Sequence, residues 1–320
     1  MNYIIIDYKG CTITANSDLE ELTRKYSDQM KDFNTQNFYI VPDESYKKLI
    51  DNNTEAFFKN NIICYSEVIL NSLDSSDNDR IIMHLNIGKS QFTLTKITSQ
   101  NSQYIFESCK SYDYNNNITI DEPDKIYELN ESFNGYLNTI GNSKKIPSLP
   151  INPHNKKSNK ININEVNDFI DQLGEKVIKN LPEKKFEMYI SGYWSNNNRL
   201  KRKFNQLKEV LPDDMLKGAK IISDGKEFSI NARGKNYLTV FVHEGTKKNI
   251  HVECMPYLRK SKPILKRVYL HENNPEICFN NQRIKVSLSK ANSLHLIAPE
   301  LKTSVFGDFY LKFNENYIKI

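Results

Sequence analysis

The sequence has no apolar run close to the roughly 20 residues that a membrane-spanning helix needs, and its mean hydropathy is −0.62. Its first residues lack the basic region and the small-residue cleavage site of a signal peptide. No two cysteines form a CxxC pair, so the sequence indicates neither a disulfide framework nor a thiolate zinc site. We therefore expect a cytoplasmic protein with reduced thiols. The five cysteines are Cys11, Cys64, Cys109, Cys254 and Cys278.

Familiar catalytic motifs are missing as well. The six histidines form neither HExxH nor HxH, which excludes the zinc-protease pattern. GxSxG, GxGxxG and GxxxxGK[ST] do not occur, which removes the commonest hydrolase, dinucleotide and P-loop patterns. His243 and His251 are expected on neighbouring strands, where packed or surface histidines are a commoner arrangement than a metal site. We therefore expect no catalytic residue set and no metal.

Charge is unevenly divided along a chain whose net charge is +5. Residues 1–143 carry a net charge of −9, and residues 144–320 carry +14. The two parts could attract each other, or the basic part could face an anionic partner. Because the basic residues are spread over several predicted elements, a solvated surface is the third interpretation. Mixed aromatic and basic segments would suit a nucleic acid, which is a less favoured partner than a protein.

Strands and helices alternate in the first 110 residues, which predicts a mixed sheet with helices on its faces. Strands are expected at 2–6, 10–15, 38–41, 62–64, 80–85, 92–98 and 103–109, and helices at 18–26, from an N-cap at Asp43, and at 66–73. Residues 142–162, which are rich in Pro, Asn and Lys, are predicted to form a linker.

Behind the linker the pattern first returns to helices and then becomes β-rich. Helices are expected at 164–181, 197–210 and 225–233, with strands at 186–191 and 219–222. From about residue 240, short alternating segments such as Ile284, Val286 and Leu288 predict an antiparallel β domain with one buried face. The sequence therefore predicts an α/β part followed by a β domain at 241–320.

Three of the predicted strands end in a turn that contains glycine. The first, Ile4–Ile6, is followed by Asp7, Tyr8, Lys9 and Gly10. The second, from Ile81, ends in Asn86, Ile87 and Gly88, followed by Lys89 and Ser90. The third, Phe186–Ser191, ends in Gly192, Tyr193 and Trp194 and enters a predicted helix. Glycines of this kind let backbone amides approach a phosphate group.

In this order the three turns resemble those of the actin-like ATPase superfamily, which includes the heat-shock ATPase chaperones and the bacterial actin relatives. The resemblance implies a reduced ribonuclease-H-like fold of two lobes, at about 1–140 and 160–240, around a nucleotide cleft. It places Asp7, Lys9 and Gly10 at the first phosphate turn and Asn86, Gly88, Lys89 and Ser90 at the second. Gly192, Tyr193 and Trp194 take the adenosine turn, and Ala232-Arg233-Gly234 resembles the end of a later short helix. ATP or ADP with Mg²⁺ is the cofactor that it implies.

Departures from the family pattern lead to the functional hypothesis. Asn86 stands where the family usually has an aspartate, and a neutral amide cannot supply a carboxylate for Mg²⁺ or for the attacking water. Tyr193 and Trp194 add bulk where small residues are expected. We therefore expect a nucleotide-independent or weakly nucleotide-binding pseudo-ATPase that acts as a scaffold, adaptor or chaperone-like binder. We expect either no cofactor or ATP or ADP with Mg²⁺, and little or no ATP hydrolysis.

Two rival functions stay open. One is an active ATPase in which Asp7 supplies the carboxylate, and the other is an anion- or nucleic-acid-binding protein that uses the basic second half. For the favoured hypothesis we expect an acidic protein partner at a basic cluster in the β domain. The cluster comprises Arg259, Lys260, Lys262, Lys266 and Arg267.

Overall fold

The computed structural model divides into two compact units, Met1–Asn101 with Ser108–Phe228, and Ser102–Glu107 with Ser229–Ile320. It describes residues 2–8, 11–15, 37–73, 79–88, 91–100, 103–113, 125–128, 163–192, 195, 197–204, 207–226, 228, 230, 235–241, 247–253, 262–263, 268–269, 276–279, 282–285, 296–297, 300–313 and 316–319. The expected helix at 18–26, the expected linker at 142–162 and the match at 232–234 lie outside the described residues.

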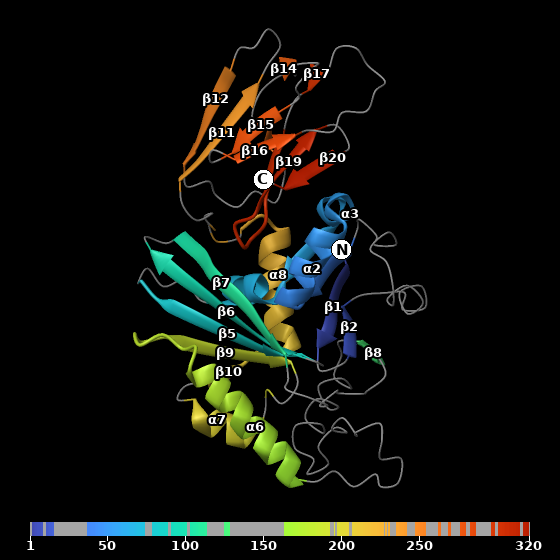
Figure 1. Cartoon of the computed structure of the whole chain (residues 1–320). Helices are drawn as coiled ribbons and strands as arrows, with labels where there is room; N and C mark the ends of the chain where they lie inside the picture. The colour runs from blue at the N-terminus through green and yellow to red at the C-terminus, as the bar shows by residue number, and fades with distance from the viewer. Residues whose placement is uncertain are drawn as a thin grey trace, which may run out of the picture. The chain divides into compact units, whose positions relative to one another are not determined.

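The first unit holds two five-stranded sheets, except that β7 (Gln103–Asp113) of the second sheet begins in residues assigned to the second unit (Figure 1). In the first sheet the order is β4-β3-β1-β2-β8. β1 and β2 form an antiparallel pair, β3 pairs with β1 and β4 with β3 in parallel, and β8 pairs with β2 in parallel. The strands are β1 (Asn2–Tyr8), β2 (Cys11–Ala15), β3 (Asn37–Val41), β4 (Asn61–Cys64) and β8 (Lys125–Glu128). Apolar runs such as Ile4–Ile6 and Phe38–Val41 are buried throughout, as a sheet covered on both faces requires.

The second sheet has the order β10-β9-β5-β6-β7. β5 and β6 are antiparallel, while β9 pairs with β5 and β10 with β9 in parallel. Its strands are β5 (Ile81–Ile87), β6 (Gln91–Gln100), β7 (Gln103–Asp113), β9 (Glu187–Gly192) and β10 (Leu207–Glu209). Because β5 and β9 are neighbours, this sheet joins strands from both sides of the lobe boundary that the sequence suggested at 140–160.

Helices follow the strands in both halves of this unit. The first half has α2 (Asp43–Asn52), α3 (Thr54–Lys59) and α4 (Tyr65–Ser72), and the second has α6 (Ile163–Ile178), α7 (Asn198–Lys203) and α8 (Pro212–Ser223). α4, which follows β4, and α8, which follows β10, pack against each other. A Cβ atom on Gly218 of α8 would lie 1.9 Å from the Val68 carbonyl oxygen of α4, so the contact requires glycine.

Three predictions about this region are wrong. The expected helix at 197–210 ends at Lys203, because residues 207–209 leave it to pair with β9. The expected strand at 219–222 belongs to α8, which begins with Pro212 and buries Met215, Ala219 and Ile222 at helical spacing. Ile230, inside the expected helix at 225–233, forms an isolated parallel bridge with Tyr104.

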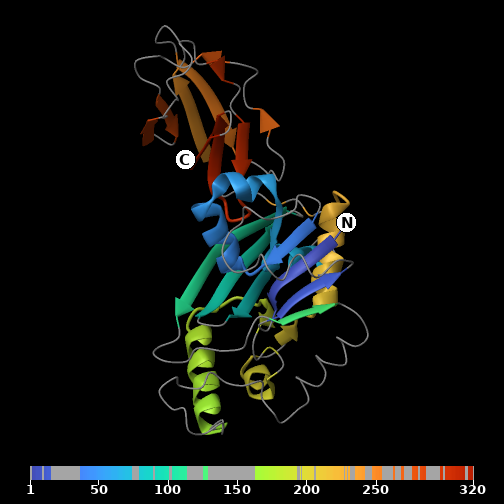
Figure 2. The ribbon, with the colours of Figure 1, turned by 90° about the vertical axis from the view of Figure 1, so that its right-hand side faces the viewer.

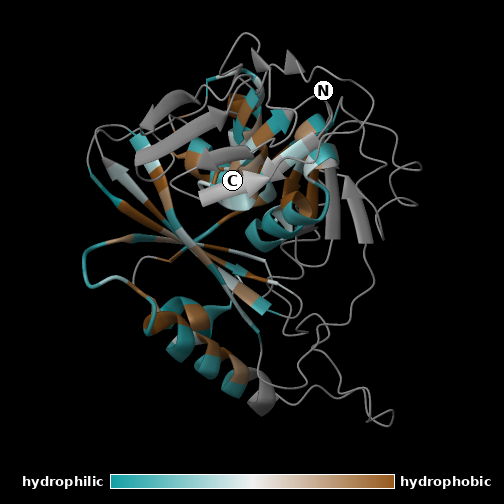
Figure 3. Cartoon of the chain, turned by 45° about the horizontal axis from the view of Figure 1, so that its top comes forward, coloured by the Kyte–Doolittle hydropathy of each residue, from teal (hydrophilic) through white to brown (hydrophobic). Residues whose placement is uncertain are grey.

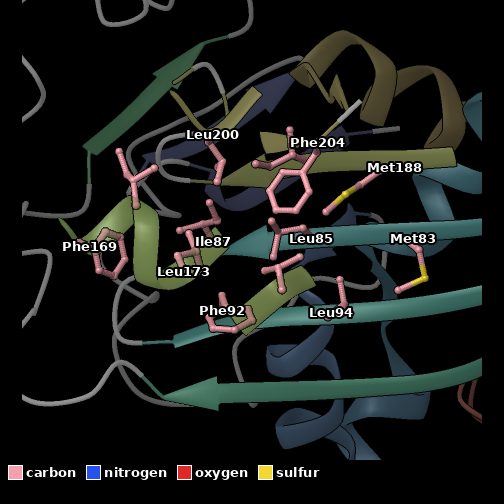
Figure 4. Close-up of a cluster of buried hydrophobic side chains, with 13 residues drawn as sticks. Met83, Leu85, Ile87, Phe92, Leu94, Phe169, Leu173, Met188, Leu200 and Phe204 are labelled. Carbon is pink, nitrogen blue, oxygen red and sulfur yellow. The ribbon is translucent and has the colours of Figure 1, made fainter. Parts of the chain in front are cut away.

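One face of the second sheet carries a cluster of buried apolar side chains. Figure 3 shows the apolar residues of α6 on the side that faces the strands, and Figure 4 shows Phe169 and Leu173 beside Ile87 and Phe92. The cluster comprises Met83, Leu85, Ile87, Phe92, Leu94, Phe169, Ile170, Leu173, Val177, Met188, Ile190, Leu200 and Phe204. In Figure 2 the long helix α6 stands apart from the first sheet, so its apolar stripe serves the second sheet.

The second unit consists of short antiparallel strands. One sheet has the order β12-β11-β15-β16 and another β13-β18-β19-β20, and β14 pairs with β17. The first sheet's strands are β11 (Lys235–Phe241), β12 (Lys247–Glu253), β15 (Glu276–Phe279) and β16 (Gln282–Lys285). The others are β13 (Lys262–Pro263), β14 (Val268–Tyr269), β17 (Leu296–Ile297), β18 (Glu300–Thr303), β19 (Phe309–Phe313) and β20 (Asn316–Lys319).

Candidate functional site

The candidate site is a buried polar layer on the face of the second sheet opposite α6. Successive strand residues point to opposite faces, so Leu85 and Ile87 join the apolar cluster while His84 and Asn86 point to the other side. Thr95 lies opposite His84, and Thr93 lies opposite Asn86 in β6. Ser191 of β9 lies beside Asn86 in the parallel pair. The polar layer, as we use the term, comprises Asp43, Glu44, Ser66, His84, Asn86, Thr93, Thr95 and Ser191.

Helix α2 supplies the two carboxylates of the polar layer. Pro42 is its N-cap residue, with φ −53° and ψ 149°, and Asp43 and Glu44 form its first turn. Acidic side chains in a first turn interact favourably with the helix dipole. The prediction that Asp43 is the N-cap residue is wrong, because Pro42 takes that position and α2 has no side-chain cap hydrogen bond. Asp43 instead accepts hydrogen bonds from residues of other elements.

The Asp43 carboxylate accepts hydrogen bonds from three donors on two residues. Ser66, in the first turn of α4, donates its backbone N–H to Oδ1 at 2.9 Å and its hydroxyl to Oδ2. The Thr95 hydroxyl donates to Oδ2 at 2.5 Å. A free amide at the start of α4 is thus satisfied by a residue 23 positions earlier in the chain. Asp43 therefore connects α2 with α4 and with the second sheet.

His84 connects this carboxylate to β9. Its Nδ1 lies 2.7 Å from the Ser66 hydroxyl and 3.5 Å from Asp43 Oδ2, and its Nε2 lies 2.8 Å from Ser191 Oγ. Burial opposes ionisation of Asp43, but the hydrogen bond and positive charge of His84, together with Ser66, outweigh it and hold the pKa of Asp43 below its usual value. The arrangement therefore favours an ionised Asp43.

A second branch of the layer surrounds Glu44. Ser191 donates its hydroxyl to Asn86 Oδ1 at 2.8 Å, and Asn86 Nδ2 lies 3.5 Å from Glu44 Oε1. The Thr93 hydroxyl donates to Glu44 Oε2 at 2.9 Å and lies 3.1 Å from Ser111 Oγ. Burial and the nearby charge of Asp43 raise the pKa of Glu44 despite the hydrogen bonds that oppose them. Glu44 is thus the carboxyl that more readily keeps its proton.

Two glycines close the strand ends beside the layer. Gly192 has φ +84°, and a Cβ atom there would lie 2.2 Å from the Ile87 carbonyl oxygen. The Gly88 amide donates to the Gln91 carbonyl oxygen at 2.9 Å and closes the β5–β6 hairpin, and a Cβ atom there would lie 3.2 Å from Glu44 Oε1. The two predicted turns are therefore neighbours, and each glycine has a backbone reason for its presence.

Ser191, His84 and Asp43 are aligned like a nucleophile, its base and an orienting carboxylate. The three residues are 0%, 1% and 0% exposed, respectively, and the Ser191 proton points to Asn86. A nucleophile must reach its substrate, so this arrangement does not provide an accessible acyl-transfer site. It does provide a continuous chain of hydrogen bonds through the centre of the unit.

The thiols near the layer are poor nucleophiles. Burial, with the negative charges of Asp43 and other carboxylates, raises the pKa of Cys109 to about 12 and raises the pKa of Cys64 well above its usual value. A reactive cysteine needs a lowered pKa and access to solvent. Within the described part of the chain, no group of His, Cys, Asp and Glu side chains is arranged to hold a metal ion.

The structure brings together Asn86, Gly88 and Gly192 among the residues predicted for nucleotide binding. The backbone of Asp7 lies in β1, which approaches β9, but its side chain is not among those described. Lys262 lies in β13 opposite Leu301, again without a described side chain. The remaining predicted positions lie outside the described residues: Lys9, Gly10, Lys89, Ser90, Tyr193, Trp194, Arg259, Lys260, Lys266 and Arg267.

Sequence reasoning missed most of the polar layer. Asp43 and Glu44 on α2, His84 on β5 and the threonines of β6 were not expected to meet. A signal was present, because His84 and Asn86 interrupt one face of an apolar strand, and Thr93 and Thr95 do the same in β6. Such a face, if buried, must find hydrogen-bond partners, although the pattern does not name them.

No protein-family model and no curated protein matches the chain. Among solved structures, the chain is similar to a subunit of a 15-stranded ParM filament from Clostridium botulinum. The TM-score is 0.36 and the sequence identity 12%, over 61% of this chain and 69% of that one. Among the helices that the structure describes, none is long and apolar enough to cross a membrane.

Proposed function

We propose that the first unit is a reduced actin-like ATPase module that no longer turns over nucleotide and acts through protein–protein contact. It would serve as a scaffold, adaptor or chaperone-like binder, with the β-rich second unit as the partner-binding part. This combines the resemblance of three glycine turns in the sequence with the geometry of the polar layer.

Repetition of one topology in the two halves supports the actin-like assignment. Each half begins with an antiparallel hairpin, β1–β2 or β5–β6, and then adds two parallel strands on the other side of its first strand. In each half a helix follows the outermost parallel strand, α4 after β4 and α8 after β10, and these two helices pack together. Two similarly built halves are what the two-lobed fold implied by the resemblance requires.

The burial and hydrogen bonding of Asn86 are the observation that supports the proposed loss of ATP turnover. In the family an aspartate at this turn handles Mg²⁺ and water, whereas Asn86 is 2% exposed and its amide is occupied by Ser191 and Glu44. A neutral, buried and hydrogen-bonded amide supplies neither charge nor an open coordination position. At the described end of β5, the polar side chains serve the fold and not a phosphate.

Calorimetric titration of the full chain with ATP and ADP in the presence of Mg²⁺, together with a steady-state hydrolysis assay, tests this proposal. We expect no turnover above the background and no saturable heat. Steady hydrolysis that disappears in Asp7→Ala would overturn the proposal and establish the active-ATPase alternative. Saturable binding without hydrolysis would leave a nucleotide-binding pseudo-ATPase and remove the nucleotide-independent form.

The basic cluster of the β-rich unit gives a second test. Exposed charges govern mainly the association rate and the salt dependence of binding. Reversal of Lys260, Lys262 and Arg267 to Glu should therefore weaken retention on an immobilised acidic polypeptide, poly-glutamate, and leave the thermal midpoint almost unchanged. The matched control reverses Lys48, Lys179 and Lys184, which are exposed in the first unit. Equal effects of the two triple variants would remove the cluster from the mechanism.

A further inference from the structure

We propose that the polar layer is a proton-controlled latch, in which a doubly protonated His84 paired with an ionised Asp43 ties helix α2 to the second sheet. This inference does not depend on whether nucleotide binds. It follows from the number of hydrogen atoms that the side chains can donate, and it assigns the layer a role in changing the shape of the unit.

The first step concerns Ser66. A serine hydroxyl has one hydrogen, and Ser66 directs it to Asp43 Oδ2, because an ionised carboxylate only accepts. The Ser66 oxygen must then accept at its 2.7 Å contact with His84 Nδ1. His84 therefore carries a hydrogen on Nδ1.

Counting the hydroxyl hydrogen of Ser191 in the same way shows whether His84 Nε2 carries a hydrogen. Ser191 directs its one hydrogen to Asn86 Oδ1 at 2.8 Å, so its oxygen must accept at the 2.8 Å contact with His84 Nε2. His84 therefore carries a hydrogen on Nε2 as well. A ring with hydrogen on both nitrogens is a cation, and Asp43 is the carboxylate that faces it at 3.5 Å.

With Asp43 ionised, a neutral His84 would require the Asn86 amide to be reversed. Asn86 Nδ2 would then donate to Ser191, whose hydrogen would turn to His84 Nε2, and Asn86 Oδ1 would face Glu44 Oε1 across 3.5 Å. Two oxygens at that position are compatible only if Glu44 is protonated. The two arrangements thus differ in where one proton resides, on His84 or on Glu44.

Most of the ionisable groups around the pair are acids, and the two thiols among them are neutral because their pKa values are raised. Around the Asp43–His84 pair lie Glu44 and Lys47 of α2, Cys64 at the end of β4, Glu67 of α4 and Cys109 of β7. Lys47 directs its ammonium to the Cys109 carbonyl oxygen at 3.4 Å. A cationic His84 offsets the charge of Asp43 in a place where an unpaired carboxylate would be costly.

Opening of the latch would release a polar surface. Because the pKa of Asp43 is lowered in the fold, ionised Asp43 stabilises the folded protein at pH values above the usual pKa of an aspartate. That stabilisation is lost as the pH falls through the lower pKa of the folded protein. Protonated Asp43 would no longer hold the imidazolium and the three donors, so α2 would separate from β5 and β6 and expose His84 and Thr95.

Nitrogen-15 NMR of the full chain with labelled histidine tests the closed state. We expect His84, assigned by comparison with His84→Gln, to show two protonated ring nitrogens at neutral pH. In Asp43→Asn, which keeps the shape but removes the charge, His84 should show one. One unprotonated ring nitrogen in the wild-type protein would overturn the proposal, and so would an unchanged state of His84 in Asp43→Asn.

Hydrogen exchange measured against pH tests the opening and does not rely on a variant. After correction for intrinsic rates, acidification should speed exchange of the Ser66 amide and the hydrogen-bonded amides of α2 by up to about tenfold for each pH unit between the usual pKa of an aspartate and the lower pKa of Asp43 in the fold, and no further below it. Amides in α6, on the other face of the sheet, provide the internal control. Equal acceleration in α2 and α6 would mean global unfolding and would overturn the latch.

Discussion

The two faces of the second sheet are built by different physical means. Toward α6 the centre of the face is apolar, with Leu85 and Ile190 fully buried among other hydrocarbon side chains. Toward α2 the same strands bury His84, Asn86 and Ser191, which depend on directional hydrogen bonds. An apolar face tolerates an imperfect fit at moderate cost, whereas a polar face is stable only while its donors and acceptors are matched. The four predictions below test this difference.

We expect the largest effect on the polar face, from Asp43→Ala. This change leaves three donors and the His84 charge without their acceptor and should lower the free energy of unfolding by about 3–5 kcal/mol. Urea denaturation measures the loss. Lys48→Ala, at an exposed position of the same helix, is the control and should change stability by less than about 0.5 kcal/mol. A loss as small as that of the control would mean that the layer contributes no stability through Asp43.

On the apolar face, Leu85→Ala should cost about 3 kcal/mol, because it removes methyl groups from a fully buried cluster and leaves a cavity. The loss should be insensitive to pH, unlike that of Asp43→Ala. Leu211→Ala, in which the native side chain is 46% exposed, is the matched control and should be nearly neutral. A pH-dependent loss at Leu85 would show that the two faces are energetically coupled.

Thr93→Val tests whether shape alone sustains the polar face. Valine matches threonine in size but removes the hydroxyl that donates to Glu44, so we expect a loss of about 1–2 kcal/mol. Thr93→Ser keeps the hydroxyl and should recover part of that stability. Thermal denaturation of both variants gives the comparison. A more stable Thr93→Val protein would show that Glu44 does not need this donor.

The smallest effect is expected from Glu44→Gln and should be visible mainly in the pH dependence. Because burial raises the pKa of Glu44, the stability that its protonated form provides is present below the pKa of the unfolded chain and is lost as the pH rises through the higher folded pKa. Glutamine does not ionise, so stability should fall less over that interval. Glu55→Gln, on the exposed side of α3, is the control. Identical pH profiles for wild type and Glu44→Gln would contradict the raised pKa.

The strands of the first unit were predictable because burial on both faces requires continuous β-branched and aromatic runs, as in Phe38–Val41. The helix expected at 197–210 was wrong since Leu200, Phe204 and Leu207 have helical spacing, but Leu207 begins a strand that pairs with β9. Such pairing depends on a distant partner and overrides local periodicity. A mixed α/β fold could therefore be predicted from the sequence, whereas the helices and strands after residue 197 could not be predicted correctly.

The candidate site was less predictable than the fold. Asn86, Gly88 and Gly192 were identified from turn patterns, and they are neighbours in the structure. Their partners Asp43 and Glu44 come from a helix about 40 residues earlier, and Ser191 lies 107 residues after His84. Periodicity reports which face of an element is buried, but it does not report which other element covers that face. Asp43 was accordingly interpreted as a local helix cap.

The parallel pairing of β5 with β9 has a consequence for the order of folding. Contacts within β1–β4 and within the β5–β6 hairpin join segments close in sequence, whereas the His84–Ser191 contact closes a loop of more than 100 residues. The entropy of such closure grows slowly with length, by about 0.6 kcal/mol per doubling, but it must be overcome before the strand gains its contacts. We expect β9, with β10 and α8 behind it, to join late. Until then the apolar and the polar face of β5 are both exposed, so a nascent or slowly folding chain would be most prone to aggregation through this strand.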